Sequence, residues 1–180
     1  MKVGIINVTG YAGSELVRIL YRHPEAEITS VTGRSAAGKR LSEALPHLWR
    51  LDMPITRAIE GSVDIVFSTL PSGASAEVLA PLVDDGIKAI DIAADFRLHN
   101  PTAFKQVYNT DHPAPHLLDD AVYGLPEIHR ESIRESRLIA NPGCYPEATI
   151  LGLAPAVKEG LIVDDIVVDA KSGISGAGRG

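Results

Sequence analysis

The stretch of sequence that decides the fold is KVGIINVTGYAGSELVRIL, at residues 2–20. An apolar run at Val3–Val8 leads into glycines at positions 10 and 13, and apolar residues then recur at helical spacing as far as Arg22. A strand, a glycine turn and a helix in this order are typical of the first unit of a parallel sheet that is buried on both faces. We therefore expect further strand–helix units along the chain.

The glycine turn carries most of a dinucleotide-binding pattern. Gly10 and Gly13 fall where the second and third glycines of G-x-G-x-x-G fall, and Val8 takes the place of the first. The second glycine lets the backbone approach a pyrophosphate, and the third lets the helix pack against the strand. A wider spacing gives the turn position to Asn7, a residue type that tolerates left-handed backbone angles. The turn predicts a nucleotide site, with a plain glycine-rich strand–helix turn as the alternative.

Strands and helices alternate along most of the remaining chain. The apolar patterns predict strands at 28–32, 63–70, 89–92, 138–140 and 162–170, and helices at 12–22, 74–83 and 146–158. Pro155 is expected to kink the last helix or to end it early. Residues 99–136, rich in Pro, His, Asp and Asn, are expected to form an irregular excursion. The order of elements predicts an α/β protein with a Rossmann-type, doubly wound parallel sheet.

The composition excludes several classes of protein. The 180 residues carry a formal net charge of -6, with 45% hydrophobic and 22% charged residues, which is ordinary for a globular domain and unlike a nucleic-acid-binding surface. No apolar run approaches the roughly 20 residues of a membrane span, and the N-terminus lacks a signal-peptide pattern. A single cysteine allows no internal disulfide, so we expect a cytoplasmic protein without nucleic-acid or membrane partners. The chain ends on SGISGAGRG, a composition on which a domain rarely ends, and we expect a fragment.

The end of the second predicted strand indicates which nucleotide binds. NAD sites place Asp or Glu about 20 residues after the glycines, where the carboxylate bonds the ribose 2′-OH. Here the sequence is Thr32-Gly33-Arg34-Ser35, without an acid. Arg34 and Ser35 can hold a 2′-phosphate by charge-assisted hydrogen bonds, which predicts NADP (NADPH) as the cofactor. The alternative is that Arg34 is a solvated loop cation.

Cys144 lies between a predicted strand and a predicted helix, in ANPGCYP at residues 140–146. A helix N-terminus stabilises a thiolate, which is the nucleophilic form of cysteine. A turn at the carboxyl edge of the sheet would direct this thiol toward the cofactor. The alternative is a buried, inert cysteine.

Two further segments suit an anionic substrate. Arg97, after the strand at 89–92, can bind a phosphate bidentately, or it can form a structural ion pair with Asp91 or Asp95. Residues 172–179, SGISGAGR, can bring backbone amides close to a cofactor or an oxyanion, with a flexible linker as the alternative. The six histidines show no metal-binding spacing, and no metal site is predicted.

Six segments together resemble one family. They are GYAG at 10–13, STLP at 68–71, ADFR at 94–97, YGLPE at 123–127, NPGCYP at 141–146 and SGISGAGR at 172–179. In this order they resemble the N-acetyl-gamma-glutamyl-phosphate reductases, and the likeness spans essentially the whole chain. That family is similar in design to aspartate-semialdehyde dehydrogenases and, more distantly, to phosphorylating glyceraldehyde-type dehydrogenases.

The resemblance implies an oxidoreductase of arginine biosynthesis that uses NADPH to reduce N-acetyl-gamma-glutamyl phosphate to N-acetylglutamate semialdehyde and phosphate. Cys144 would attack the acyl phosphate and form a thioester, Arg97 would hold the phosphate and Asn141 would orient the site. The implied cofactor contacts are Thr9, Gly10, Tyr11, Ala12, Gly13, Arg34, Ser35, Ser68, Pro71, Ser175 and Gly176. It also implies an NADP-binding domain at 1–144, the start of a truncated catalytic and dimerisation domain of α+β type at 145–180, and a homo-oligomer when full length.

The sequence departs from the family pattern in two ways. Asn7 stands where the family usually has glycine. The family's catalytic histidine, a general acid–base, lies beyond residue 180. We therefore predict that the 180-residue chain binds nucleotide but turns over poorly or not at all.

Three other interpretations remain open. A sister reductase would act on an aminoadipyl phosphate of lysine biosynthesis, free or carried on a protein, and would share most of these segments. An aspartate-semialdehyde dehydrogenase is disfavoured by YGLPE and PGCYP. A non-catalytic NADP-binding module would combine intact NADPH binding with an inert Cys144, whereas a rapidly alkylated Cys144 would indicate the enzyme.

Overall fold

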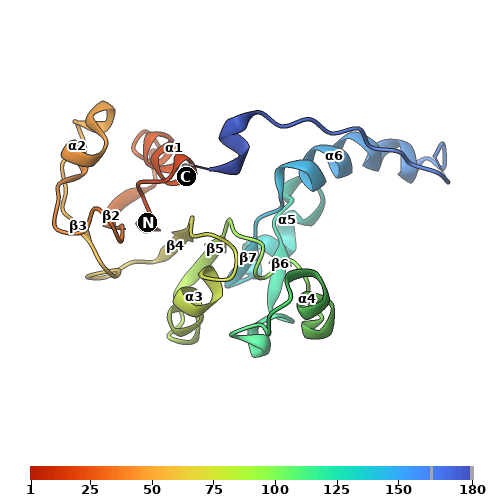
Figure 1. Cartoon of the computed structure of the whole chain (residues 1–180), viewed down its shortest axis with the longest axis horizontal. Helices are drawn as coiled ribbons and strands as arrows, with labels where there is room; N and C mark the ends of the chain where they lie inside the picture. Colours follow the sequence, from red (N-terminus) through yellow and green to blue (C-terminus); the bar gives the residue numbers. More distant parts are fainter. Residues whose placement is uncertain (163, 179–180) are drawn as a thin grey trace.

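In the computed structural model, residues 1–162 and 164–178 are described, and they build a seven-stranded sheet flanked by helices (Figure 1). The strand order is β3-β2-β1-β4-β5-β7-β6, and neighbouring strands pair in parallel. The strands are β1 (Lys2–Ile6), β2 (Glu27–Thr32), β3 (Ile55–Thr56), β4 (Ile65–Ser68), β5 (Lys88–Asp91), β6 (Ala121–Tyr123) and β7 (Leu138–Ala140). The predicted doubly wound parallel sheet is confirmed.

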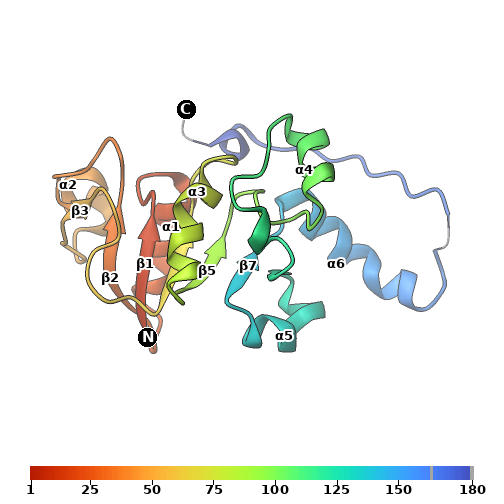
Figure 2. The ribbon, with the colours of Figure 1, turned by 90° about the horizontal axis from the view of Figure 1, so that it is seen from below.

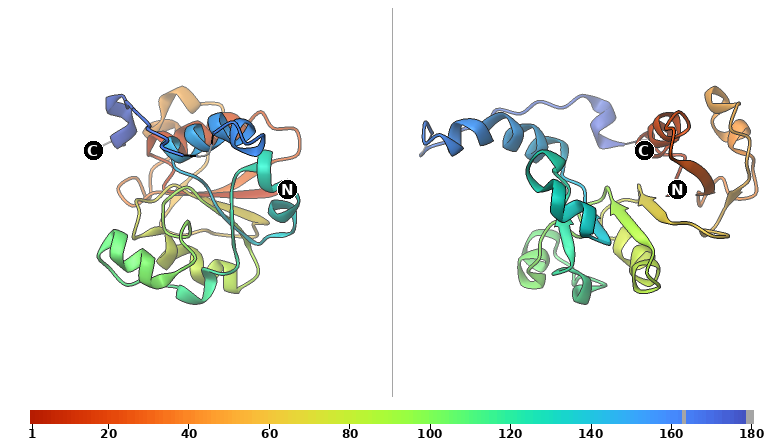
Figure 3. Two further views of the ribbon diagram at one scale, coloured as in Figure 1. Left: turned by 90° about the vertical axis from the view of Figure 1, so that its right-hand side faces the viewer. Right: turned by 180° about the vertical axis from the view of Figure 1, so that it is seen from behind.

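Helices cover both faces of this sheet. α1 (Tyr11–Leu20) and α6 (Cys144–Lys158) lie on one face, and α3 (Ser75–Asp84) and α4 (Pro101–Tyr108) lie on the other (Figures 1 and 3). The remaining helical segments are α2 (Leu41–Ala44), α5 (Pro126–Glu135) and the 3-10 turns η1 (Pro46–Leu48), η2 (Pro115–Leu117) and η3 (Ile174–Ala177). This layering leaves the carboxyl ends of the strands along one edge of the molecule.

Each face of the sheet buries its own apolar cluster because side chains alternate along a strand. Val3 and Ile5 of β1 pack with Val17 of α1 on one face. Ile6 of β1 packs with Leu79 of α3 in the cluster on the other face. A central strand that is apolar on both sides accounts for the unbroken apolar run with which the chain opens.

The prediction that residues 99–136 are irregular was wrong. This segment forms α4, η2, β6 and α5. Pro101, Pro115 and Pro126 are each the first residue of a helix, a position where the missing N–H leaves no hydrogen bond unmade. Asn100 caps α4 by accepting hydrogen bonds from the N–H groups of Thr102 and Ala103. Three of the four prolines that suggested a loop are therefore helix starts.

Two predictions near the end of the chain also need correction. α6 runs through Pro155 to Lys158, the end predicted for this helix, so the early end given as one possible effect of Pro155 is wrong. Pro155 has no N–H group, so one backbone carbonyl of α6 loses its helical hydrogen bond. Because α6 has no buried residue, water can donate a hydrogen bond to this carbonyl instead. The strand predicted at 162–170 is not formed at 164–170. Among the described residues, no strand pairs with this segment through backbone hydrogen bonds. Residue 163 of that prediction lies outside the described residues.

Candidate functional site

The carboxyl ends of the strands share one edge of the sheet, which runs along the top of Figure 2. From β1 the chain builds outward to β2 and β3, and it then returns to place β4 on the other side of β1. The strand order therefore reverses between β1 and β4. Open α/β sheets bind their ligands in the crevice at such a reversal point.

Asn7 bridges this reversal point. Its backbone has a φ of 65°, in the left-handed region that asparagine tolerates. Its Nδ2 donates to the carbonyl oxygen of Thr69, after β4, at 2.9 Å, and Thr69 Oγ1 donates to Asn7 O at 2.8 Å. The residue that departs from the family pattern therefore joins the ends of β1 and β4 through its side chain.

The glycine turn after β1 is shaped for close packing and for access. A Cβ on Gly13 would lie 2.6 Å from Asn7 O, so only glycine fits between α1 and the turn. A Cβ on Gly10 would meet nothing closer than 3.7 Å, which leaves the turn open on its outer side. Gly10 is the N-cap of α1 and has no side chain with which to cap it. The first N–H groups of α1, from Tyr11 and Ala12 onward, thus lie where a phosphate could accept hydrogen bonds from them.

A cleft of about 380 Å³ opens beside this turn. Its lining residues come from the ends of β1, β2, β3 and β4 and from one side of α3. They are Ile6, Asn7, Thr32, Gly33, Arg34, Arg57, Ala58, Ile59, Leu70, Val78, Pro81 and Leu82. Most of the lining is apolar, and the two cations in it are Arg34 and Arg57. Pockets of this kind suit a flat organic ring with a charged substituent.

Arg57 is a site candidate that the sequence analysis missed. It follows β3, a strand of only two residues, which gives too short an apolar pattern to recognise. The parallel register aligns Thr32 with Thr56, and the Gly33 N–H donates to Thr56 O at 3.1 Å. This pairing brings Arg57 to the same cleft as Arg34. Ser35, predicted beside Arg34, is exposed but does not line the cleft.

Cys144 is the first residue of α6 and its side chain is exposed. Gly143 is the N-cap of that helix. The predicted exposed thiol at a helix N-terminus is therefore present, and the interpretation of a buried cysteine is wrong. β7 is separated from β1 by β4 and β5, so at about 4.8 Å per strand the thiol loop stands about 14 Å from the glycine turn along the edge.

Arg97 joins β5 to the loop that carries the thiol. Its Nε donates to Asn141 O at 2.8 Å, and its Nη2 donates to Ile92 O at 2.9 Å. Its Nη1 lies beside Gly143, where a Cβ would approach it to 3.0 Å. The predicted alternative of an ion pair with Asp91 or Asp95 is not found among the described residues. Nη1 takes part in no hydrogen bond within that part of the chain, so it is free to meet an anion.

Behind the edge lies a buried polar network. The Ser75 hydroxyl donates to Asp91 Oδ1 at 2.5 Å and lies 2.6 Å from Ser68 Oγ. Since Ser75 has a single hydroxyl hydrogen, Ser68 is the donor in the second contact. Burial raises the pKa of Asp91 to about 6, and the negative charge of Asp95 adds to the rise. Ser68 is fully buried, which gives its hydroxyl a structural role; its contact with a cofactor stays a prediction.

Asp95 organises the start of α3. Its carboxylate accepts hydrogen bonds from the N–H groups of Gly73, Ser75 and Ala76 at 2.7, 3.0 and 2.9 Å. These donors belong to the turn after Pro71 and to the first turn of α3, whose orphan N–H groups need acceptors. The buried acid of the ADFR segment therefore fixes the turn in which Pro71 lies exposed.

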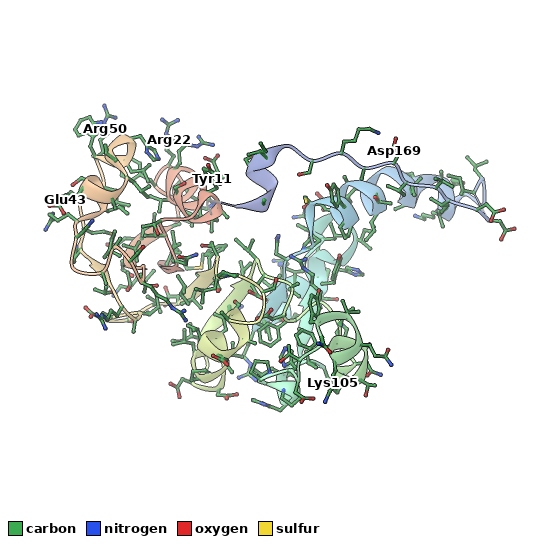
Figure 4. All side chains as sticks on the ribbon, in the orientation of Figure 1. Tyr11, Arg22, Glu43, Arg50, Lys105 and Asp169 are labelled. Carbon is green, nitrogen blue, oxygen red and sulfur yellow. The ribbon has the colours of Figure 1, made fainter. Side chains whose placement is uncertain are left out.

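The segment that carries Ser175 and Gly176 returns to the same edge of the sheet. It forms η3, which lies beside the start of α1 (Figures 1 and 3), where Tyr11 is labelled in Figure 4. Gly176 donates its N–H to Gly173 O at 3.0 Å. Both predicted residues are exposed, and their contact with a cofactor stays a prediction.

Neither a metal cluster nor a membrane-spanning helix is found in the part of the chain that the structure describes. Among residues 1–162 and 164–178, no group of three or more His, Cys, Asp or Glu side chains is arranged to hold a metal ion. No helix within these ranges is long and apolar enough to cross a membrane.

Comparison with known families identifies the fold unit. Residues 2–136 match the family described as semialdehyde dehydrogenase, NAD binding domain. The chain belongs to the semialdehyde dehydrogenase family. Residues 144–180 match a second description, semialdehyde dehydrogenase, dimerisation domain. The domain boundary predicted after residue 144 stays a prediction, since the two matches leave 137–143 between them.

Curated relatives of this semialdehyde dehydrogenase chain bear the name that the sequence resemblance suggested. An N-acetyl-gamma-glutamyl-phosphate reductase from Dehalococcoides mccartyi is 57% identical over 178 residues, covering 99% of the chain and 52% of that protein. One from Halothermothrix orenii is 47% identical, covering 100% of the chain and 54% of that protein. The chain thus spans about half the length of the curated relatives that it matches.

Solved semialdehyde dehydrogenases share the fold. The aspartate semialdehyde dehydrogenase with NADP from Candida albicans matches 88% of the chain and 47% of its own, with a TM-score of 0.64 and 20% identity. Aspartate semialdehyde dehydrogenase II from Vibrio cholerae matches 87% of the chain and 46% of its own, with a TM-score of 0.62 and 19% identity. The sheet and its helices are therefore those of this dehydrogenase family.

Proposed function

We propose that this chain is the NADP-binding and thiol-bearing half of an N-acetyl-gamma-glutamyl-phosphate reductase. The observation that carries the proposal is the placement of an exposed Cys144 on the same sheet edge as the glycine turn. The relatives at up to 57% identity support the choice of substrate, N-acetyl-gamma-glutamyl phosphate. The full-length protein would be a cytoplasmic homo-oligomer of arginine biosynthesis.

The chain's residues fit a nicotinamide dinucleotide. The open turn at Gly10 and the first N–H groups of α1 would receive the pyrophosphate. The cleft that contains Arg34 would receive the adenosine half, and its positive charge favours NADP over NAD. The η3 segment would lie along the pyrophosphate at Ser175 and Gly176. When bound, NADPH supplies the hydride that the reduction requires.

Cys144 would perform covalent catalysis. Its thiolate attacks the acyl carbon of the substrate, a C–S bond forms, and the C–O bond to phosphate breaks with its electron pair leaving on phosphate. The N-terminus of α6 stabilises the negative sulfur before attack. After reduction at the same carbon, the C–S bond breaks and the thiolate is restored as the aldehyde leaves.

Arg97 and Asn141 would position the reacting groups. Arg97 is held by the carbonyls of Ile92 and Asn141, so its charge is fixed rather than flexible. Its remaining Nη1 group would bind the phosphate of the substrate next to the thiol loop. Asn141, which precedes that loop, keeps its own side chain bonded to Pro142 O at 3.1 Å. We further propose that residues 1–180 bind nucleotide without robust turnover, because the general acid–base is supplied by the other half of the enzyme.

The test is the reverse reaction in a full-length protein that carries this chain. N-acetylglutamate semialdehyde, phosphate and NADP are supplied, and the appearance of NADPH is followed in parent and Cys144→Ser proteins. Activity that disappears in the variant, with nucleotide binding unchanged, supports the reaction and the nucleophile. Activity with the aminoadipate analogue instead would reject the substrate, and equal activity in the variant would reject Cys144.

A further inference from the structure

Arg34 and Arg57 line the cleft without the carboxylate partners that some other arginines of the chain have. Arg40 forms an ion pair with Asp52 at 2.5 Å, and Arg18 forms one with Glu15. Arg34 and Arg57 have no hydrogen-bond or ion-pair partner among the residues that the structure describes, and both line the cleft. None of the residues lining the cleft is acidic. In a chain of net charge -6, this is a local concentration of uncompensated positive charge.

The backbone holds the two arginines on adjacent strand ends. β2 and β3 pair in parallel with Thr32 aligned to Thr56, and the Gly33 N–H donates to Thr56 O. The position directly across from Arg57 in this register is Gly33, which is buried against Ile55 and Thr9, and Arg34 follows it in the chain. The backbones of Gly33 and Arg57 lie about one inter-strand spacing apart, about 4.8 Å, so Arg34 and Arg57 leave the sheet from neighbouring strand ends and both reach the cleft.

The charge of a phosphate monoester requires more than one cation. Such a group carries about -1.5 to -2 at pH 7 and has three acceptor oxygens. A single guanidinium provides one positive charge and one bidentate contact, so Arg34 alone leaves about half of the phosphate charge uncompensated. Two guanidinium groups from adjacent strands match both the charge and the number of oxygens.

We infer that Arg57 is the second cation of the 2′-phosphate site and that the preference for NADP is determined by the pair Arg34 and Arg57. This inference rests on the proposed nucleotide function. The apolar part of the cleft, including Leu70, Val78 and Pro81, receives the adenine ring. Arg57 is a specificity residue: it contacts the group that distinguishes NADP from NAD and takes no part in the reduction.

The experiment uses two small ligands that differ only in the group at issue. Adenosine 2′,5′-bisphosphate and adenosine 5′-phosphate are titrated by calorimetry into the 180-residue chain at low ionic strength. The proteins are the parent, Arg57→Ala, Arg57→Lys, Arg34→Ala and the double alanine variant. Arg22→Ala is the matched control, because Arg22 is an exposed arginine at the end of α1, on the other face of the sheet from α3 (Figure 4).

Arg57→Ala is expected to weaken the bisphosphate by about tenfold, the loss of one exposed charge-assisted contact, and to change the monophosphate by less than about twofold. Arg57→Lys recovers part of the loss, since it keeps the charge without the bidentate geometry. The double variant binds both ligands equally. Raising the salt concentration narrows the difference between parent and Arg57→Ala, whereas Arg22→Ala behaves as the parent.

Two results would overturn the inference while leaving the proposed function intact. In the first, Arg57→Ala binds the bisphosphate as tightly as the parent. In the second, it loses both ligands to the same extent, which would assign Arg57 to the adenine or to the fold. A parent chain that binds neither ligand would instead reject the nucleotide function itself, and with it the inference. Circular dichroism of each variant confirms that the sheet is retained.

Discussion

Replacing Asp91 with asparagine should change how the stability of the chain depends on pH. Asp91 is fully buried at the end of β5, and burial raises its pKa from 3.8 to about 6. At about 1.4 kcal/mol per pKa unit, this rise corresponds to about 3 kcal/mol of preference for the neutral carboxyl in the folded state. The amide of the Asp91→Asn variant is neutral at every pH, so the substitution removes the whole titration.

The sign follows from proton binding. Because the folded state holds this proton more tightly than the unfolded state, stability from Asp91 is fully present below about pH 4 and is lost as pH rises through about 6. The parent should therefore lose up to about 3 kcal/mol of unfolding free energy across this window relative to the Asp91→Asn variant. The amide oxygen can still accept from Ser75 and from the Ala93 N–H, so the network survives the change.

The assay is urea denaturation of both proteins at half-unit steps from pH 4 to pH 8, followed by tryptophan fluorescence and circular dichroism. The quantity to compare is the difference between the two unfolding free energies at each pH. The amide nitrogen takes the place of Asp91 Oδ2, which has no hydrogen-bond partner, so a constant offset of about 1–2 kcal/mol is expected. Parallel pH curves for the two proteins would refute the buried, titrating carboxylate.

Three further predictions concern the edge and its support. Gly13→Ala should destabilise the fold by about 2 kcal/mol or more, because its Cβ would lie 2.6 Å from a backbone oxygen; a midpoint of urea denaturation equal to the parent's would contradict this. His112 packs against Phe96 and Phe104, and burial is the chief cause that lowers its pKa. The stability of the fold should therefore decrease as the pH drops below about 6.5. The His112→Phe variant should lack this dependence when thermal melting is followed from pH 5 to 8. Gly143→Ala should displace Arg97 and slow the alkylation of Cys144 by iodoacetamide several-fold, without a comparable loss of stability. An unchanged alkylation rate would show that the position of Arg97 does not affect the reactivity of the thiol.

The sequence predicted those parts of the fold whose local pattern and tertiary setting agree. Val3, Ile5 and Ile6 are apolar because β1 is covered on both faces, and the glycines at 10 and 13 mark the turn that follows it. Cys144 was placed correctly at a helix start because a strand, a proline–glycine turn and an apolar helix follow each other without interruption.

The parts that were missed depend on partners distant in the chain. β3 contains two residues, and only its pairing with β2 makes it a strand and brings Arg57 to the cleft. Residues 99–136 contained a usable signal that was weighed wrongly: Asn100-Pro101 is a cap followed by a favoured first helical residue. The hydrogen bonds of Arg97 to two backbone carbonyls could not be derived from its position, because they require the register of β5 against β7.

Asn7 has a consequence for the thermodynamics of ligand binding. A glycine at this position would lose the hydrogen bond from Asn7 Nδ2 to Thr69 O, keep the bonds from the Thr69 hydroxyl between the ends of β1 and β4, and sample more backbone conformations in the free protein. With Asn7 bonded to Thr69, the turn already has one conformation before a nucleotide arrives. Less conformational entropy is then lost when the nucleotide binds. The turn after β1 is already ordered in the free protein, whereas in a relative with glycine at this position it would become fully ordered only in the complex.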